Sequence, residues 1–332
     1  MSGSFLVFGA GAWGTALSIQ LVKSGNNVVL SSFDKENLCQ IRKDRENKKY
    51  LPGFKLPKVV GVEPFSEKLL TNTDSIVVCV KSPYFKRALL LLKNNVGDNN
   101  LVWATKGFDP DNGGLLSSMV TSVVGTKTKT AILSGPTFAE ELAIGKPAAI
   151  TLATNTIDNP LLLAESMSNE SLRVYLSPDP VGVQLGGGLK NIVAIAAGIS
   201  DGLEMGANAK AALVTRALDE ISSLGLLFGA SEKTFMGLSG MGDIILSSSD
   251  DKSRNRLLGL SVGGGLSLDD AVKLQNSTPE GAHAIKALVE NGVVNDKQPV
   301  LHSVYEILYL GEKPSVIAKG LMQRPIKEEG LR

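Results

Sequence analysis

The first residues of the chain carry the pattern that most restricts its fold. A short apolar run, Phe5-Leu6-Val7-Phe8, leads into glycines at Gly9, Gly11 and Gly14, and a helical stretch, 15–22, follows. Between a strand and a helix, a Gly-x-Gly-x-x-Gly motif allows a tight turn and brings backbone N–H groups close to a pyrophosphate. The pattern therefore predicts a dinucleotide-binding α/β fold, with a purely structural glycine turn as the alternative interpretation.

Strand and helix patterns then divide the chain into two parts. Further strands are predicted at 27–31, 75–80, 101–104, 131–133 and 148–152, with helices such as 85–92 between several of them. This alternation favours a parallel, doubly wound sheet. Later the helical patterns dominate, at 207–228, 267–275, 281–291 and 300–310. We therefore predict a Rossmann-like, doubly wound dinucleotide-binding domain over residues 1–182 and a mostly α-helical substrate and catalytic domain over residues 183–332.

Composition argues against several classes of protein. The 332 residues include 34 Lys+Arg and 33 Asp+Glu, so no overall field attracts nucleic acid or anionic lipid. Cys39 and Cys79 are too few for a disulfide framework and fit a reducing cytoplasm. The N-terminus lacks the basic and apolar regions of a signal peptide, and no stretch approaches the roughly 18 apolar residues of a membrane span. We expect a cytoplasmic protein with no nucleic-acid partner, no membrane span and no bound metal.

Lys190 and Asn191 follow three glycines in the stretch 184–198, whose remaining residues are largely apolar. The length and the Ala, Ile and Leu content of this stretch predict a buried helix. A buried ammonium needs a carboxylate or phosphate partner, or else it loses its proton more readily, and either outcome suits a lysine that handles protons. The alternative is a lysine that reaches solvent from a core helix.

Polar residues also follow two of the predicted strands. Lys106 comes directly after the strand 101–104, and Ser134-Gly135-Pro136-Thr137 forms a tight turn that opens a helix. Ligands of doubly wound sheets bind beyond the carboxyl ends of strands, where free N–H groups at a helix start can hold an anion. The alternative for Lys106 is a solvated loop lysine. For the turn at 134–137 it is an ordinary connection between a strand and a helix.

The C-terminal half carries a candidate phosphate site. Asp243 ends a glycine-rich turn, and Ser253-Arg254-Asn255-Arg256 follows closely. These residues offer hydroxyl, amide and guanidinium donors for a phosphate, although a solvated loop or helix cap is the alternative. His283 and His302, the two histidines of the sequence, lie in late helical segments, which favours lysine over histidine as the proton-transfer group.

The end of the second strand leaves the choice of cofactor open. Asp34 stands 20 residues after Gly14, where an acid for the ribose is expected, but it can equally cap the next helix. No arginine stands at this strand end to bind a 2′-phosphate, although Ser31, Ser32 and Lys35 can contribute. Phe33 is placed to contact adenine, with core packing as the alternative.

These motifs together resemble the bacterial type of NAD(P)-dependent glycerol-3-phosphate dehydrogenase, essentially from end to end. The matching segments are 9–16, 47–53, 103–107, 134–139, 182–191, 240–243 and 253–256. Many dehydrogenases share the first segment, whereas the last four together are specific to this family. The resemblance implies reversible reduction of dihydroxyacetone phosphate to sn-glycerol 3-phosphate by hydride from the nicotinamide, a supply of glycerol 3-phosphate for phospholipid synthesis, and a homodimer. The cofactor would be NADP(H) or NAD(H), and the bacterial type favours NADP(H).

The same resemblance implies residue roles. Lys190 would be the general acid and base, with Lys106, Asn191 and Asp243 orienting it and the substrate. The other substrate contacts would be Gly135, Thr137, Ser253, Arg254 and Asn255. The cofactor contacts would be Gly9, Gly11, Ala12, Trp13, Gly14, Phe33, Lys106, Ala139, Arg254 and Glu280.

This chain departs from the family pattern at several positions. Lys81 replaces a usual proline, Ser31 a common tryptophan, and Phe33 a basic or polar residue, while Ser247-Ser248-Ser249 replaces a Thr-Cys-Thr-like run. Two other functions remain as alternatives. One is a dehydrogenase of β-hydroxy acids, and the other is a catalytically silent dinucleotide sensor.

Overall fold

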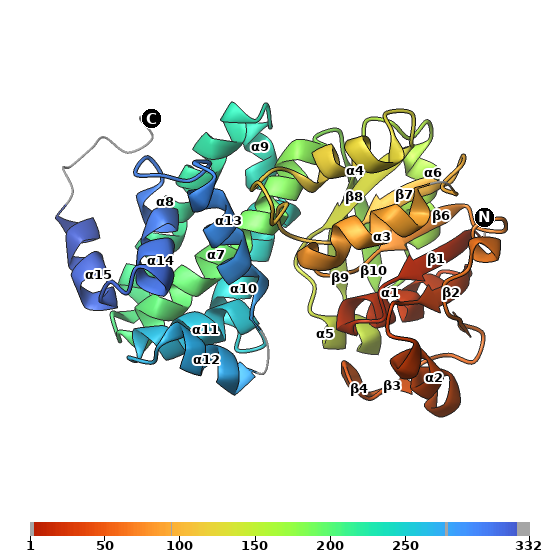
Figure 1. Cartoon of the computed structure of the whole chain (residues 1–332), viewed down its shortest axis with the longest axis horizontal. Coiled ribbons are helices and arrows are strands. Elements are labelled where there is room, and N and C mark those ends of the chain that lie inside the picture. The colour runs from red at the N-terminus through yellow and green to blue at the C-terminus, as the bar shows by residue number, and fades with distance from the viewer. Residues whose placement is uncertain (1–2, 94, 276–277, 324–332) are drawn as a thin grey trace. The chain divides into compact units, whose positions relative to one another are not determined.

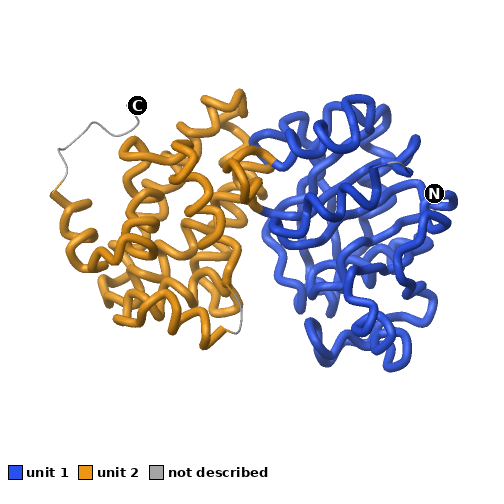
Figure 2. Tube along the Cα trace, in the orientation of Figure 1, with its two compact units in different colours: residues 1–106, 116–183 blue, residues 107–115, 184–332 orange. Residues whose placement is uncertain are grey.

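The computed structural model describes residues 3–93, 95–275 and 278–323. Figure 1 gives the order of the helices and strands, and Figure 2 distinguishes two compact units. Unit 1 comprises residues 1–106 and 116–183, and unit 2 comprises residues 107–115 and 184–332.

Unit 1 is organised around an eight-stranded sheet (Figure 1). In spatial order its strands are β10 (Leu172–Ser177), β9 (Ala148–Ala153), β8 (Thr130–Ser134), β7 (Asn100–Trp103), β6 (Ser75–Val78), β1 (Ser4–Phe8), β2 (Asn27–Ser31) and β5 (Gly61–Val62). Neighbouring strands run parallel at every pairing except β8 with β9. The Rossmann-like sheet predicted from the sequence is thus confirmed as a mostly parallel sheet.

The remaining elements of unit 1 are helices and one small hairpin. They are α1 (Ala12–Lys23), α2 (Lys35–Asp44), α3 (Phe85–Leu92), α4 (Leu116–Val124), α5 (Ala139–Ile144), α6 (Pro160–Met167), the 3₁₀ turns η1 (Glu67–Leu69) and η2 (Ser82–Tyr84), and the hairpin strands β3 (Glu46–Asn47) and β4 (Leu51–Lys55).

The direction of β9 and β10 differs from the all-parallel expectation. The only helix between β8 and β9 is α5, which has six residues and so rises about 9 Å. The six residues of β9 extend about 20 Å. Because a parallel crossover must carry the chain back along the whole strand length, a helix this short does not provide one, and β9 returns antiparallel to β8.

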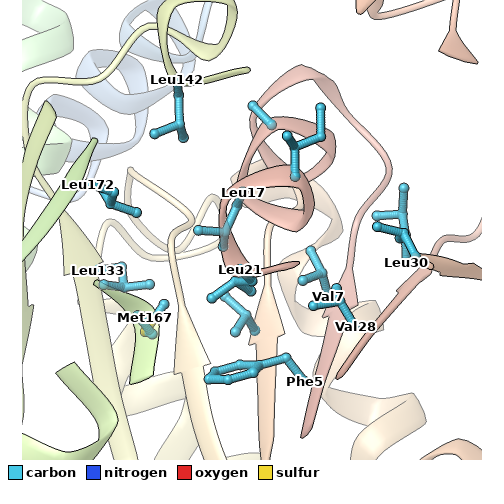
Figure 3. Packing of buried hydrophobic residues seen from close by; sticks show 14 of the residues in the cluster. Phe5, Val7, Leu17, Leu21, Val28, Leu30, Leu133, Leu142, Met167 and Leu172 are labelled. Atoms are coloured by element: carbon cyan, nitrogen blue, oxygen red, sulfur yellow. The ribbon is translucent and has the colours of Figure 1, made fainter. Parts of the chain in front are cut away.

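Alternate residues of β1 are buried on opposite faces of the sheet. Phe5 and Val7 pack in a cluster that includes Leu17 and Leu21 of α1 (Figure 3). The next residues along the strand, Leu6 and Phe8, belong to a second cluster, with side chains of α3 and α4. Since helices cover both faces, the strand reads in the sequence as one continuous apolar run.

The regular elements of unit 2 among its described residues are helices, apart from an isolated antiparallel bridge between Phe108 and Leu115. Its elements are the main part of α7 (Pro180–Gly202), α8 (Gly206–Leu227), α9 (Glu232–Phe235), the π-helical turn η3 (Leu238–Gly242), α10 (Asp243–Ser249), α11 (Arg254–Gly263), α12 (Leu268–Gln275), α13 (Glu280–Glu290), α14 (Pro299–Tyr309) and α15 (Pro314–Met322). The helices α8, α12, α13 and α14 begin within one residue of their predicted starts.

Helix α7 is the buried helix that the stretch 184–198 predicts. Its length and mean hydropathy would allow it to cross a membrane, but 94% of its most apolar window is buried inside the protein. It is the only such helix among the residues that the structure describes. Its composition therefore reflects a place in the protein core.

Glycines allow α7 and α11 to cross with their backbones in close contact. A Cβ atom added to Gly198 of α7 would lie 2.0 Å from the carbonyl oxygen of Arg256. A Cβ atom added to Gly259 of α11 would lie 2.0 Å from the carbonyl oxygen of Ile195. No side chain fits at either position, so this crossing fixes α11, and the polar residues at its start, against α7.

Candidate functional site

Lys190 is held by a carboxylate in the interior of unit 2. Its side chain is 12% exposed, and Asp243 opposite it is 1% exposed. The Nζ of Lys190 donates hydrogen bonds to Asp243 Oδ1 at 2.9 Å and to Ser247 Oγ at 2.6 Å. The ammonium thus has the anionic partner that its burial demands.

Local backbone structure explains how these three side chains meet. A Cβ atom added to Gly186 would lie 2.6 Å from the carbonyl oxygen of Ser239, so α7 lies directly against the π-helical turn η3. Lys190 stands one helical turn after Gly186, and Asp243 is the first residue of α10, directly after η3. Ser247 follows one turn later on α10, which places its hydroxyl on the same side as the carboxylate.

Helices α7, α11 and α13 of unit 2 meet at Asn255. Its Nδ2 donates to Asn191 Oδ1 of α7 at 3.0 Å, and its Oδ1 accepts from the backbone N–H of Gly281 on α13 at 2.9 Å. Both ends of the Asn255 amide are therefore fixed, which defines its orientation. Glu280, the first residue of α13, precedes Gly281.

The start of α11 presents the predicted phosphate donors. Ser253 is its N-cap, and the Ser253 Oγ accepts from the N–H of Arg256 at 3.3 Å. The Arg256 side chain pairs with Asp201 at 2.6 Å, so it has a structural partner. Arg254 is exposed at the first position of the helix, where N–H groups and the helix dipole favour an anion.

In unit 1 the glycine-rich loop has the geometry of a pyrophosphate site. Gly9 has a φ of +127°, and a Cβ atom there would lie 2.6 Å from the carbonyl oxygen of Cys79. A Cβ atom on Gly14 would lie 2.1 Å from the carbonyl oxygen of Gly9, whereas one on Gly11 would meet nothing within 4 Å. Packing thus requires the first and third glycines, and the second leaves space beside the backbone for a ligand.

Asn47 holds this loop in place by hydrogen bonds from its side chain, a role that the sequence analysis missed. Its side chain is fully buried, and its Nδ2 donates to the carbonyl oxygen of Ala10 at 3.0 Å and to Thr15 Oγ1 at 2.8 Å. Asn47 lies far from the glycine-rich loop in sequence, so no local pattern indicates this contact. The family resemblance includes the segment 47–53, which is the signal that could have pointed to it.

The polar strand ends of unit 1 also come together. The Nζ of Lys106 donates to the carbonyl oxygen of Gly135 at 3.0 Å. The indole Nε1 of Trp13 donates to Thr137 Oγ1 at 2.9 Å, across 124 residues of sequence. The glycine-rich loop and the turn before α5, whose first residue is Ala139, are therefore neighbours.

The structure decides the role of Asp34 at the end of β2. Asp34 caps α2 by accepting from the N–H of Asn37 at 2.9 Å, and it also binds Lys49 Nζ at 2.8 Å. The hydrogen bond from Lys49, followed by that from Asn37, holds the pKa of the Asp34 carboxyl below its usual value. Of the two interpretations of Asp34, the helix cap is the one that the structure supports.

The ring of the neighbouring Phe33 packs against another aromatic ring and makes a cation–π contact. Its centroid lies 4.9 Å from that of Phe8 in an edge-to-face arrangement. The guanidinium carbon of Arg87, from α3, lies 4.3 Å from the Phe33 centroid. Arg87 had no signal in the sequence analysis, because it is far from the end of β2 along the chain.

The predicted site residues thus form two sets. Unit 1 contains Gly9, Gly11, Ala12, Trp13, Gly14, Phe33, Lys106, Gly135, Thr137 and Ala139, and unit 2 contains Lys190, Asn191, Asp243, Ser253, Arg254, Asn255 and Glu280. Within the described ranges, no group of three or more His, Cys, Asp or Glu side chains is placed to hold a metal ion.

Comparisons with known proteins give a consistent family. Residues 4–159 match the N-terminal part, and residues 179–319 the C-terminal part, of the NAD-dependent glycerol-3-phosphate dehydrogenase family. A relative from Francisella tularensis subsp. tularensis, strain WY96-3418, named glycerol-3-phosphate dehydrogenase [NAD(P)+], is 42% identical over 99% of this chain and 100% of its own length.

Two solved structures named glycerol-3-phosphate dehydrogenase resemble this chain over nearly its whole length. A glycerol-3-phosphate dehydrogenase from Coxiella burnetii has a TM-score of 0.91 and 32% identity, over 97% of this chain and 99% of its own. A yeast protein of the same name has a TM-score of 0.84 over 98% of this chain and 100% of its own. At 24% identity, the second likeness shows the fold alone.

Proposed function

The chain belongs to the NAD-dependent glycerol-3-phosphate dehydrogenase family, and on this premise we propose how its residues perform the reaction. The protein is an NAD(P)-dependent oxidoreductase that reversibly reduces dihydroxyacetone phosphate to sn-glycerol 3-phosphate. The observation that carries the proposed mechanism is the buried contact of Lys190 with Asp243 and Ser247, because it holds one proton donor in a defined position.

The nicotinamide cofactor fits unit 1. The open space beside Gly11 allows the pyrophosphate to approach the loop backbone, and the first N–H groups of α1 offer it donors. We assign residues 1–182 as the dinucleotide-binding domain. Further cofactor contacts would be Ala12, Trp13, Phe33, Lys106, Ala139, Arg254 and Glu280. When bound, the nicotinamide supplies or accepts the hydride.

Lys190 is the general acid of ketone reduction in this proposal. The carbonyl oxygen gains negative charge as hydride reaches its carbon, and the Lys190 ammonium donates a proton to that oxygen. In the reverse direction, the neutral amine accepts the proton of the hydroxyl. Asp243 stabilises the ammonium, and Ser247 fixes the position of Nζ. General acid catalysis of this kind contributes about 100- to 10,000-fold.

The start of α11 would bind the substrate phosphate. Arg254 offers a planar pair of N–H donors that matches two phosphate oxygens, and Ser253 and Asn255 add neutral donors. The Asn255 amide is already oriented by Asn191 and Gly281, so it loses little freedom on binding. We assign residues 183–332 as the substrate and catalytic domain. Lys106, Gly135 and Thr137 are also proposed as substrate-binding residues.

We also propose three properties that rest on the family alone. The protein is a homodimer, it acts in the cytoplasm, and its product supplies phospholipid synthesis. Neither nucleic acid nor a membrane is expected as a partner, in keeping with the balanced charge of the chain.

The substrate assignment is tested by following nicotinamide absorbance with purified protein. We expect rapid decay with dihydroxyacetone phosphate and far slower decay with dihydroxyacetone, which lacks the phosphate. Arg254→Gln should lower kcat/KM for the phosphorylated ketone about 10- to 100-fold, since it removes a charged hydrogen-bond donor. Turnover of phosphate-free β-hydroxy acids, or cofactor binding without any ketone reduction, would contradict the assignment.

A further inference from the structure

The end of β2 brings a cation and an aromatic ring together from separate segments of unit 1. Phe33 lies two residues past β2 and packs edge-to-face on Phe8, the last residue of β1. The exposed Arg87 side chain extends from α3 over the Phe33 ring. A guanidinium is attracted to the face of an aromatic ring, so the ring holds it in place.

The N–H donors of the Arg87 guanidinium are available to another partner. Throughout the parts of the chain that the structure describes, no hydrogen bond or salt bridge engages this side chain, which lies over the Phe33 ring. Stacking on a ring leaves the N–H groups at the edge of the guanidinium plane available. Arg87 is therefore a positioned cation with unused donors.

Its location is where this fold distinguishes two cofactors. In dinucleotide-binding α/β folds, an acid near the end of the second strand contacts the ribose 2′-hydroxyl of NAD, whereas an arginine accommodates the 2′-phosphate of NADP. The acid at the expected spacing, Asp34, is already bonded to Asn37 and Lys49. The Ser31 side chain is fully buried, and the Ser32 Oγ accepts from the N–H of Asp34.

We propose that Arg87, held over Phe33, forms a binding site for the cofactor 2′-phosphate and makes the enzyme prefer NADP(H). The guanidinium presents a planar fork to the phosphate dianion, and pre-positioning by Phe33 reduces the entropy lost on binding. This inference rests on the proposed function, because it assumes that a dinucleotide binds at the glycine-rich loop. It identifies an arginine at the position where sequence alone found none.

Binding of two cofactor fragments tests this inference without any hydride transfer. Calorimetric titration with 2′-phospho-ADP-ribose and with ADP-ribose compares ligands that differ by the single phosphate. The wild-type protein should bind the phosphorylated fragment more tightly. Arg87→Ala should weaken it about 10- to 100-fold, as expected for loss of a charge-assisted contact, and should change ADP-ribose affinity less than about twofold. Arg87→Lys keeps the charge but loses the planar fork, so its affinity for 2′-phospho-ADP-ribose should lie between those of the wild type and Arg87→Ala.

Lys86→Ala is the matched control, because it removes the neighbouring exposed cation of the same helix. It should leave the preference between the two fragments unchanged. Equal weakening of both fragments by Arg87→Ala, or no weakening of either, would overturn the inference. Neither fragment contains nicotinamide, so failure of ketone reduction would count against the proposed function and leave this binding result standing.

Discussion

The Oγ of Ser247 lies 2.6 Å from the Nζ of Lys190, so a hydroxyl on α10 fixes a lysine on α7. Ser247 is a positioning residue in this arrangement, because it acts on the substrate through Lys190. Ser247→Ala should lower kcat about tenfold, the effect of losing one hydrogen bond to a charged group, and should leave the cofactor Kd unchanged. Steady-state kinetics of both the Ala and Thr variants provide the check.

Ser247→Thr retains the hydroxyl and should recover most of the activity. If Ser247→Ala and Ser247→Thr lose activity equally, the hydroxyl does not position Lys190, and packing explains the effect instead.

Asp243 should contribute strongly to stability through its buried ion pair. Asp243→Asn leaves the Lys190 ammonium without that negative charge at a site where only 12% of its side chain is exposed. Breaking a buried pair in this way costs about 3–5 kcal/mol. Urea unfolding followed by far-ultraviolet circular dichroism suits this variant, because the helices dominate the signal.

A double-mutant cycle isolates the pair. Asp243→Asn should cost much less stability in a Lys190→Met background, where no buried ammonium remains to be neutralised. Equal costs in the two backgrounds would mean that the ion pair does not stabilise the fold.

Two glycine substitutions, one at the α7–α11 crossing and one in α15, should change the stability of the protein in opposite directions. Gly259→Ala forces a methyl group to within 2.0 Å of the Ile195 carbonyl oxygen, and should destabilise the protein by about 1–3 kcal/mol. Gly320→Ala, inside α15 with nothing within 4 Å, should stabilise it by about 0.5–1 kcal/mol. Thermal unfolding of both variants compares the signs, and a neutral Gly259→Ala would contradict the close crossing.

Asp34 predicts a pH-dependent stability in unit 1. The pKa of Asp34 is lowered in the folded state, mainly by the hydrogen bond from Lys49. Its contribution to the free energy of unfolding is therefore complete above the unfolded-state pKa of about 4, and it is lost as the pH falls through the folded-state pKa. Asp34→Ala should cost about 1 kcal/mol at neutral pH, mainly as a lost helix cap. That difference should shrink in acid.

Tryptophan fluorescence is the suitable measurement, because Trp13 and Trp103 both lie in unit 1. Asp34→Asn serves as the control, since asparagine also caps helices and does not titrate. A cost for Asp34→Ala that stays constant from pH 7 to strongly acidic pH would contradict the assigned role.

Apolar runs made much of the fold predictable. The predicted strand 27–31 and helix 85–92 coincide with β2 and α3, because each buries a regular set of apolar residues. β10 was missed because its sequence lacks such a continuous apolar run. It lies at the edge of the sheet, and its apolar residues Leu172, Val174 and Leu176 are separated by exposed residues such as Arg173 and Tyr175.

The site was predictable where one segment carries several polar residues, and not where distant segments meet. Lys190 and Asp243 belong to recognisable motifs, so both were named from the sequence, whereas only the fold shows that they touch. The contact of Arg87 with Phe33 joins the end of one strand to a helix that follows another. No local pattern encodes such a contact, because strand order decides it.

The proton-transfer role of Lys190 is the central claim, and Lys190→Ala tests it most directly. The measurement is kcat for reduction of dihydroxyacetone phosphate, with the cofactor Kd measured on the same preparation to show that unit 1 remains folded. The account predicts a loss of about 100- to 10,000-fold in kcat with an unchanged Kd, as expected when a general acid is removed. A variant that binds cofactor normally and retains kcat within a few-fold of the wild-type value would contradict it.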